Sequence, residues 1–204
     1  KGLEPNSQHI YRVRAVNELG KGEWSQIVTG LTLPDTPKNL ASDSTSYTIA
    51  ISWDAVPGAI SYDIEADGTI IDSISNTDYV HEGLQPVTEY TYKVRAINAS
   101  GAGYWSEPIS EVTKVGIPAN INAVSTSTTI TFTWDVTVGA DSYEIELDGA
   151  IISNGSNASY EYADLLPNSA HTYRIRAVNE AGYGDWSELR TKFTAPDVPG
   201  NISA

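Results

Sequence analysis

The stretch YTYKVRAIN, residues 90–98, carries the pattern that decides the fold. Tyr92, Val94 and Ala96 occupy one set of alternate positions, and the basic residues Lys93 and Arg95 occupy the other. Strict alternation of this kind predicts a β-strand with one buried face and one solvent-facing face. The same pattern appears as HIYRVRAVN at residues 9–17 and as HTYRIRAVN at residues 171–179, each displaced by 81 residues. Recurrence at a constant interval predicts one folding unit that is used repeatedly.

The residues around this stretch predict further strands and tight turns. TIAISW, residues 48–53, also alternates, which places Ile49, Ile51 and Trp53 on one face, and its counterpart one interval later ends at Trp134. The Asp-Gly pairs at residues 67–68 and 148–149 lie between strand-like runs and favour two-residue hairpins. Roughly seven short strands per unit, with no helical periodicity, predict an all-β chain of tandem seven-stranded antiparallel β-sandwiches.

Prolines mark the joints between units and set the expected domain boundaries. We expect residues 37–117 and 118–198 to be complete domains, residues 1–36 to be the C-terminal half of a domain with its last two strands, and residues 199–204 to start a further repeat. The two ends cannot combine into one unit, because strands of the Trp53 type are missing from both. We therefore expect the chain to be an excerpt from a longer array.

Composition excludes several classes of function. The formal net charge is −14 and the pI is about 4.4, which argues against nucleic acid and anionic membranes as partners. The chain has no cysteine, so it has no disulfide, no thiolate nucleophile and no cysteine-based zinc site. No apolar run approaches the roughly 18 residues of a membrane span, so we expect no membrane insertion in this segment.

The residues that lead into the long strand resemble those of fibronectin type III domains. That family has a tryptophan on its second strand, followed by the pattern Leu-x-Pro-x-Thr-x-Tyr, which here is Trp53, Leu84, Pro86, Thr88 and Tyr90. The resemblance covers the whole chain and implies an immunoglobulin-like sandwich in which Trp53, Trp134, Tyr92 and Tyr173 belong to the core. The repeats lack cysteine and contain Asp-Gly hairpins and Gly-x-Gly-x-Trp-Ser turns. In these features they resemble tandem modules of bacterial secreted or cell-surface proteins, which implies an extracellular or cell-surface location.

The corner tyrosine of the family pattern is replaced in two of the three copies. Tyr90 keeps it, whereas His9 and His171 stand at the equivalent positions. An imidazole ring there could donate a hydrogen bond to the backbone as a tyrosine hydroxyl would. We interpret both histidines as structural substitutes.

Basic and aromatic residues share one face of the expected sandwich. Six of the twelve basic residues occupy the outward positions of the long strand, and the neighbouring strand of this fold carries acidic residues opposite them. Tryptophans on the other side could stack on the arginines as cation–π ladders. The expected ladder residues are Arg14 with Trp24, Arg95 with Trp105, and Arg176 with Trp186. This face is either satisfied within its own sheet or docks a partner, and the first interpretation is favoured.

No constellation of catalytic residues appears, so we expect no enzyme activity. The Gly-x-Gly-x-Trp-Ser turns join two strands and lack the helix that a phosphate-binding loop requires. No potential nucleophile lies at a distance along the sequence from His81 that would indicate a catalytic pair, and no spacing typical of a metal site is present. We expect no cofactor, while incidental calcium binding by the acidic turns stays open.

The leading hypothesis is a non-catalytic extracellular array of modules that acts as a spacer or structural stalk. Such an array could also assemble into a surface fibre. The alternative is an adhesion module that binds a polysaccharide or a protein, with Tyr104 and Tyr183 as a stacking platform. The expected partners are therefore the neighbouring repeats, other copies of the chain, or a surface protein or polysaccharide.

Overall fold

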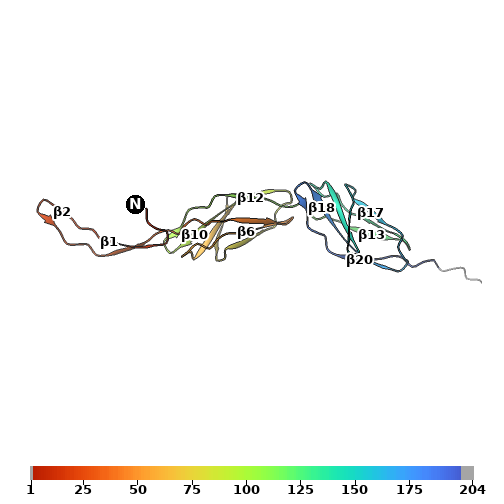
Figure 1. The fold of residues 1–204 in the computed structure, drawn as a ribbon, viewed down its shortest axis with the longest axis horizontal. Coiled ribbons are helices and arrows are strands. Elements are labelled where there is room, and N and C mark those ends of the chain that lie inside the picture. Colours follow the sequence, from red (N-terminus) through yellow and green to blue (C-terminus); the bar gives the residue numbers. More distant parts are fainter. Residues whose placement is uncertain (1, 199–204) are drawn as a thin grey trace, which may run out of the picture. The chain divides into compact units, whose positions relative to one another are not determined.

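The computed structural model describes residues 2–198 and confirms the all-β fold (Figure 1). Every regular element of these residues is a strand, and none is a helix that could span a membrane. The described residues form two compact units: one takes in residues 2–43, 50–81 and 90–111, and the other takes in residues 44–49, 82–89 and 112–198. The repeat start expected at residues 199–204 lies outside the described residues.

The second repeat, expected at residues 118–198, contains two antiparallel sheets. Its larger sheet has the strand order β16-β15-β18-β19, with β20 beside β18; its smaller sheet has the order β13-β14-β17. The larger sheet comprises β15 (Ser142–Leu147), β16 (Ala150–Ser153), β18 (Ala170–Asn179), β19 (Gly182–Tyr183) and β20 (Arg190–Phe193). The smaller sheet comprises β13 (Asn122–Ser125), β14 (Ile130–Thr133) and β17 (Ser159–Tyr162).

The core of the second repeat is built from both of its sheets. Phe132 on β14 and Ile175 on β18 are fully buried members of one hydrophobic cluster. The rings of Phe132 and Tyr173 lie 4.6 Å apart between centroids, so side chains of the two sheets are in contact. Trp134 packs edge-on against Tyr143 at 5.4 Å. Residues at alternate strand positions therefore seal one apolar interior, as the period of two predicts.

The first repeat, expected at residues 37–117, has two sheets of the same kind. The larger sheet has the order β11-β10-β7-β8 with β12 beside β10, and the smaller sheet has the order β5-β6-β9. The strands are β5 (Ala41–Ser44), β6 (Thr48–Ser52), β7 (Ser61–Ala66), β8 (Thr69–Ile74), β9 (Asp78–Glu82), β10 (Glu89–Asn98), β11 (Gly101–Ala102) and β12 (Ile109–Val112). Ile49, Ile51, Trp53, Tyr92 and Val94 are all buried.

One strand boundary differs from the sequence interpretation. The position of Trp105 directly after the Gly-rich turn predicts that the last strand begins there, but β12 begins at Ile109. The backbone N–H of Ser106 donates to Val94 at 2.8 Å, and its hydroxyl accepts from the N–H of Val94 at 3.0 Å. Because the Ser106 side chain takes one place in the hydrogen-bond ladder, regular pairing starts only after it.

The Asp-Gly pairs form the predicted hairpin turns. Asp67 and Gly68 have φ angles of 45° and 82°, and Asp148 and Gly149 have 48° and 84°. Leu147 pairs with Ala150 across the second turn, which leaves a two-residue loop. Two consecutive positive φ angles define the type I′ turn that matches the twist of the flanking strands.

Residues 2–36 form paired strands. β1 (Gln8–Tyr11) pairs antiparallel with β4 (Val28–Leu31), and β2 (Val16–Asn17) pairs with β3 (Gly20–Lys21). Tyr11 and Val13, the counterparts of core residues in the two repeats, are exposed here. The local pairing thus forms as the pattern predicts, although the apolar face is not covered.

Candidate functional site

The ladder face of the second repeat is built on the outward side of β18. The register pairs Arg176 with Glu144 and Arg174 with Glu146 on β15. Arg176 donates to Glu144 Oε2 through Nε at 2.9 Å and Nη2 at 2.6 Å. Arg174 donates to Glu146 Oε2 through the same two nitrogens at 3.0 and 2.6 Å. Each guanidinium therefore has its charge compensated within the same sheet.

Aromatic rings cover these guanidinium groups. The Cζ atoms of Arg174 and Arg176 lie 4.9 and 4.3 Å from the centroid of the Trp186 ring. The ring of Tyr183 also lies 4.0 Å from the Cζ atom of Arg176. Tyr183 therefore belongs to this stack and is not a separate platform. Cation–π stacking adds attraction that does not depend on an external partner.

The first repeat repeats the arrangement with different acids. Arg95 donates to Asp63 Oδ2 through Nε at 3.0 Å and Nη2 at 2.8 Å, and its Cζ atom lies 4.4 Å from the Trp105 ring centroid. Lys93 pairs with Glu65 at 2.8 Å. Asp63 is buried, so this pair is more strongly shielded from water than an ordinary surface ion pair.

The same stack exists in residues 2–36. The Cζ atoms of Arg12 and Arg14 lie 4.5 and 4.4 Å from the Trp24 ring centroid. The distance from arginine to tryptophan is thus nearly equal at Arg14, Arg95 and Arg176. The ladder depends on neighbouring strands alone, and it forms whether or not the opposite face is buried.

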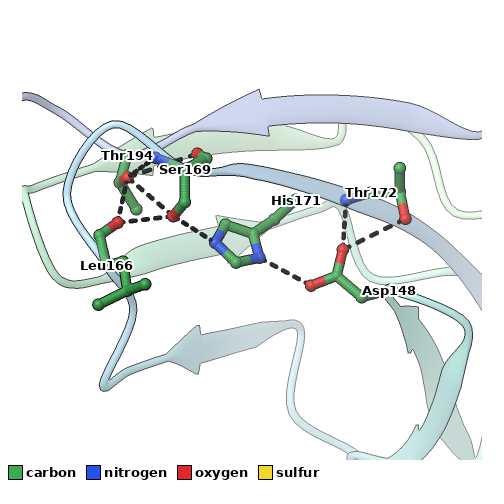
Figure 2. Close-up of polar contacts among 6 residues, drawn as sticks. All are labelled: Asp148, Leu166, Ser169, His171, Thr172 and Thr194. Carbon is green, nitrogen blue, oxygen red and sulfur yellow. Dashed lines mark hydrogen bonds and ion pairs between the residues drawn. The ribbon is translucent and has the colours of Figure 1, made fainter.

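A second cluster of polar side chains lies at the corner that leads into β18 of the second repeat (Figure 2). His171 contacts the hydroxyl of Ser169 through Nε2 at 2.7 Å and the carboxylate of Asp148 through Nδ1 at 2.7 Å. The Ser169 hydroxyl donates to the carbonyl oxygen of Leu166 at 2.6 Å, and the Thr194 hydroxyl donates to the same oxygen at 2.7 Å. The cluster connects the Asp-Gly turn, the corner and the segment that follows β20.

Asp148 is held as a carboxylate by its neighbours. Its Oδ1 atom accepts from the backbone N–H of Thr172 at 2.8 Å, while Oδ2 faces His171. Burial acts to raise the pKa of Asp148, but the hydrogen bonds from His171 and Thr172 outweigh it and lower the pKa. Burial, and secondarily the charge of Asp148, raises the pKa of Tyr162 on β17. The site therefore favours a negative charge at Asp148.

The corner histidines differ from the sequence interpretation. We expected each ring to donate directly to the backbone, but His171 contacts a hydroxyl that in turn donates to a carbonyl group. His9 does the same: its Nε2 atom lies 2.7 Å from the Ser7 hydroxyl, which donates to the backbone carbonyl oxygen of Glu4 at 2.5 Å. The contribution of Asp148 was missed, although its Asp-Gly motif was recognised as a turn. Tyr90 at the equivalent position packs against His81 with ring centroids 6.0 Å apart.

The atoms of Ser169, His171 and Asp148 are in the order of a nucleophilic triad, but their hydrogen bonds are different. In a triad the serine proton is directed at the histidine, which acts as general base. Here the Ser169 hydroxyl also lies 2.6 Å from the Leu166 carbonyl oxygen, which can only accept a hydrogen bond. The arrangement therefore works as a cross-link between chain segments.

The remaining candidate residues are distributed without forming a common centre. His81 Nδ1 lies 3.0 Å from the hydroxyl of the core residue Tyr92. Tyr104 is 79% exposed and follows the short strand β11. Among residues 2–198, no group of three or more His, Asp or Glu side chains could hold a metal ion.

Comparisons with known proteins agree with this architecture. The family model for the fibronectin type III domain matches residues 35–112 and 116–193. The chain is 28% identical to Fibronectin type-III domain-containing protein 3A of Homo sapiens, covering 100% of this chain and 20% of that protein. It is 32% identical to Protein sidekick-2 of Mus musculus (66% of this chain, 7% of that protein) and 24% identical to Exoglucanase B of Cellulomonas fimi (89% and 19%). The chain therefore spans about a fifth or less of these relatives.

Solved structures of tandem modules are also similar. The crystal structure of the chicken CNTN1 FN1-FN3 domains has a TM-score of 0.43 at 20% identity, covering 95% of this chain and 79% of that one. A segment of two fibronectin type III domains from chicken tenascin has a TM-score of 0.42 at 21% identity, covering 78% of this chain and 100% of that one.

Proposed function

Because the chain belongs to the fibronectin type III family, we propose that it is a non-catalytic structural array that spaces other parts of a longer extracellular protein. The observation that carries this proposal is the ladder face, on which charged side chains are paired inside each repeat. Arg95, Arg174 and Arg176 each have an acidic partner on the adjacent strand and an aromatic ring on the other side. A partner would have to break these contacts to reach the charges, which disfavours binding there.

The regularity of the repeats supports the same function. The first and second repeats keep the interval of 81 residues, and both use a two-residue Asp-Gly turn between the corresponding strands. Recognition modules usually vary their loops, because loops carry their binding residues. Constant short loops are better suited to spacing than to recognition.

We propose further that the array lies outside the cell, in a secreted or surface protein of bacterial type, and that assembly into a fibre is the alternative form of its structural role. Absence of cysteine and methionine from the 204 residues makes the chain resistant to oxidation, which suits that location. Equal repeats would present equivalent contacts along a fibre.

Analytical ultracentrifugation and negative-stain microscopy across a hundredfold range of concentration would test this proposal. A spacer should remain a single species, whereas a fibre-forming array should grow in length with concentration. Saturable binding of a surface polysaccharide or protein to the ladder face would contradict the spacer function.

A second candidate function is polysaccharide binding, and the exposure of Tyr104 favours it. An exposed aromatic ring can stack on a sugar, and similarity to Exoglucanase B gives polysaccharides as the class to test. A glycan array with wild-type protein and the variant Tyr104→Ala would show binding that depends on this ring. Tyr183→Ala is the matched control, because Tyr183 is already stacked on Arg176. Equal signals for all three proteins would exclude the candidate.

A further inference from the structure

Three short contacts form a line through the corner of the second repeat (Figure 2). They join the Leu166 carbonyl oxygen to Ser169 Oγ at 2.6 Å, Ser169 Oγ to His171 Nε2 at 2.7 Å, and His171 Nδ1 to Asp148 Oδ2 at 2.7 Å. Electronegative atoms approach this closely only with a proton between them. Each of the three contacts therefore needs its own proton.

The available protons can be counted from the chemistry of the four groups. The carbonyl of Leu166 and the carboxylate of Asp148 only accept, and the Ser169 hydroxyl supplies one proton. The hydroxyl proton of Thr194 is used at the Leu166 carbonyl group, 2.7 Å away. A neutral imidazole adds one proton, which leaves one contact empty, whereas an imidazolium adds two and fills all three.

We propose that His171 is held as an imidazolium, and that the corner of the second repeat is a proton-binding clasp that closes only when this proton is bound. The clasp holds three segments of the chain: the β15–β16 turn through Asp148, the corner through Leu166 and Ser169, and the segment that follows β20 through Thr194. This proposal does not depend on the spacer function.

His9 provides an internal comparison within the chain. Its Nε2 atom contacts the Ser7 hydroxyl at 2.7 Å, and this hydroxyl donates to the backbone carbonyl oxygen of Glu4, so only two contacts need protons. The Ser7 hydroxyl and a neutral ring with its proton on Nε2 supply both. Among the described residues, no carboxylate pairs with the ring of His9. The carboxylate of Asp148 is therefore the group that distinguishes His171.

The groups that face His171 are of both signs. Asp148 in the β15–β16 turn supplies the negative charge, with side-chain exposures of 14% for His171 and 38% for Asp148. Tyr162 on β17 places its neutral ring edge-on at 5.5 Å. Lys192 on β20 is the register partner of His171, and its positive charge opposes the imidazolium. The direct contact at 2.7 Å favours the attraction to Asp148, because the ammonium of Lys192 is on a flexible stem that reaches water.

The proton on His171 sets the direction in which the corner responds to pH. A histidine in an unfolded chain loses its proton near about pH 6.5. The clasp is closed while the ring of His171 carries both protons, and it opens when the ring loses one of them. The second repeat should therefore loosen at its corner when the surroundings become alkaline.

Long-range ¹H–¹⁵N NMR of the full chain at about pH 7.5, one unit above the usual histidine titration, reads the ring protons directly. We expect both ring nitrogens of His171 to have the shifts of an imidazolium, and His9 to have the shifts of a neutral ring protonated at Nε2. A neutral His171 in the folded wild-type chain would overturn the proposal, without any need for a variant.

The variant Asp148→Asn tests the cause, and Asp67→Asn is its matched control. Both aspartates follow a strand and accept from a threonine N–H, at 2.8 Å from Thr172 and 2.9 Å from Thr91, but Tyr90 takes the place of histidine in the first repeat. We expect Asp148→Asn to convert His171 to a neutral ring at about pH 7.5, and Asp67→Asn to leave it unchanged. An imidazolium that persists in Asp148→Asn would contradict the clasp.

Labelling with a fluorophosphonate tests whether His171 is instead neutral. A neutral His171 that accepts the Ser169 proton would act as a general base and promote covalent labelling of Ser169. The imidazolium cannot accept a proton, so we expect Ser169 to remain unlabelled. Labelling of wild type that is lost in Ser169→Ala would overturn the proposal and indicate a nucleophile.

Discussion

Residues 9–17 and 171–179 have nearly the same sequence pattern and opposite environments. Tyr11 and Val13 are 49% and 72% exposed, whereas their counterparts Tyr173 and Ile175 are 5% and 0% exposed. In the second repeat, Phe132 on β14 reaches Tyr173 from the smaller sheet, and among residues 2–36 no such sheet is present. Alternation therefore determines which face of a strand is apolar, but a second sheet is needed to bury it.

The same comparison shows which interactions are local. Arg14 lies 4.4 Å from the Trp24 ring centroid and Arg176 lies 4.3 Å from that of Trp186. The stack thus has the same geometry over an uncovered apolar face and over a buried one. Cross-strand contacts on the outer face do not require a core, because adjacent strands alone bring the side chains together.

The largest effect is expected from supplying the missing sheet to the N-terminal segment. A copy of residues 37–81 fused before Lys1 continues the interval of 81 residues, because Lys1 corresponds to Glu82. We expect Tyr11 and Val13 to become buried and a new cooperative unit to form, stable by about 4–12 kcal/mol as for a small domain. Hydrogen exchange at residues 8–31 would measure this, and a fusion of the same length with Gly/Ser sequence is the control. Unchanged exchange in the first fusion would show that the pattern does not specify the same sandwich.

Removal of the covering side chain should produce the next largest effect. Phe132→Ala leaves a cavity beside Tyr173 and should cost about 3–5 kcal/mol in the free energy of unfolding of the second repeat. Val13→Ala in the exposed segment should change stability by less than about 0.5 kcal/mol. Urea denaturation followed by tryptophan fluorescence would compare the two. Equal costs would contradict the difference in burial.

The corner of the second repeat should show a dependence on acid that residues 2–36 lack. Since its hydrogen bonds lower the pKa of Asp148, its stabilisation is present above the unfolded value of about 3.9 and is lost as the pH falls through the lowered pKa. At about pH 6, the free energy of unfolding of wild type should exceed that of Asp148→Asn by about 1 kcal/mol. This difference is smaller than is usual for a charged hydrogen bond, because Asp148 is partly exposed.

Denaturation at a series of pH values would measure this difference, which should shrink as the pH falls below the pKa of an unfolded aspartate. Asp67→Asn serves as the control for the loss of an equivalent turn contact. A difference that is constant from about pH 6 to about pH 2 would contradict the assignment.

The smallest effect is expected from the ladder, and it should be similar in the two regions. Trp186→Ala and Trp24→Ala each remove an aromatic ring from two arginines. Each should cost about 0.5–1 kcal/mol in cation–π attraction, in addition to lost packing. A double-mutant cycle of Trp186→Ala with Arg176→Ala would isolate the coupling energy. A coupling energy near zero would show that the stack adds little to the free energy of unfolding.

Much of the fold could be predicted because it depends on patterns that repeat along a strand. The alternation in residues 90–98 predicted the buried positions Tyr92 and Val94, and the Asp-Gly pairs predicted their turns. The start of β12 at Ile109 could not be predicted, because the Ser106 side chain replaces a backbone partner and only its geometry reveals this. Local sequence indicates which residues prefer a strand, but it does not show which atoms fill each place in the ladder.

The sequence by itself determined the repeat interval, the strand faces, the hairpin turns and the pairing of outward arginines with acids, since all of these arise from neighbours along one strand or across one turn. Only the tertiary structure decided that Asp148 and His171, which are 23 residues apart, share a hydrogen bond at 2.7 Å. It also decided that Tyr11 is exposed while Tyr173 is buried. Contacts between distant segments depend on how sheets pack, and the period of a strand carries no information about what lies across its face.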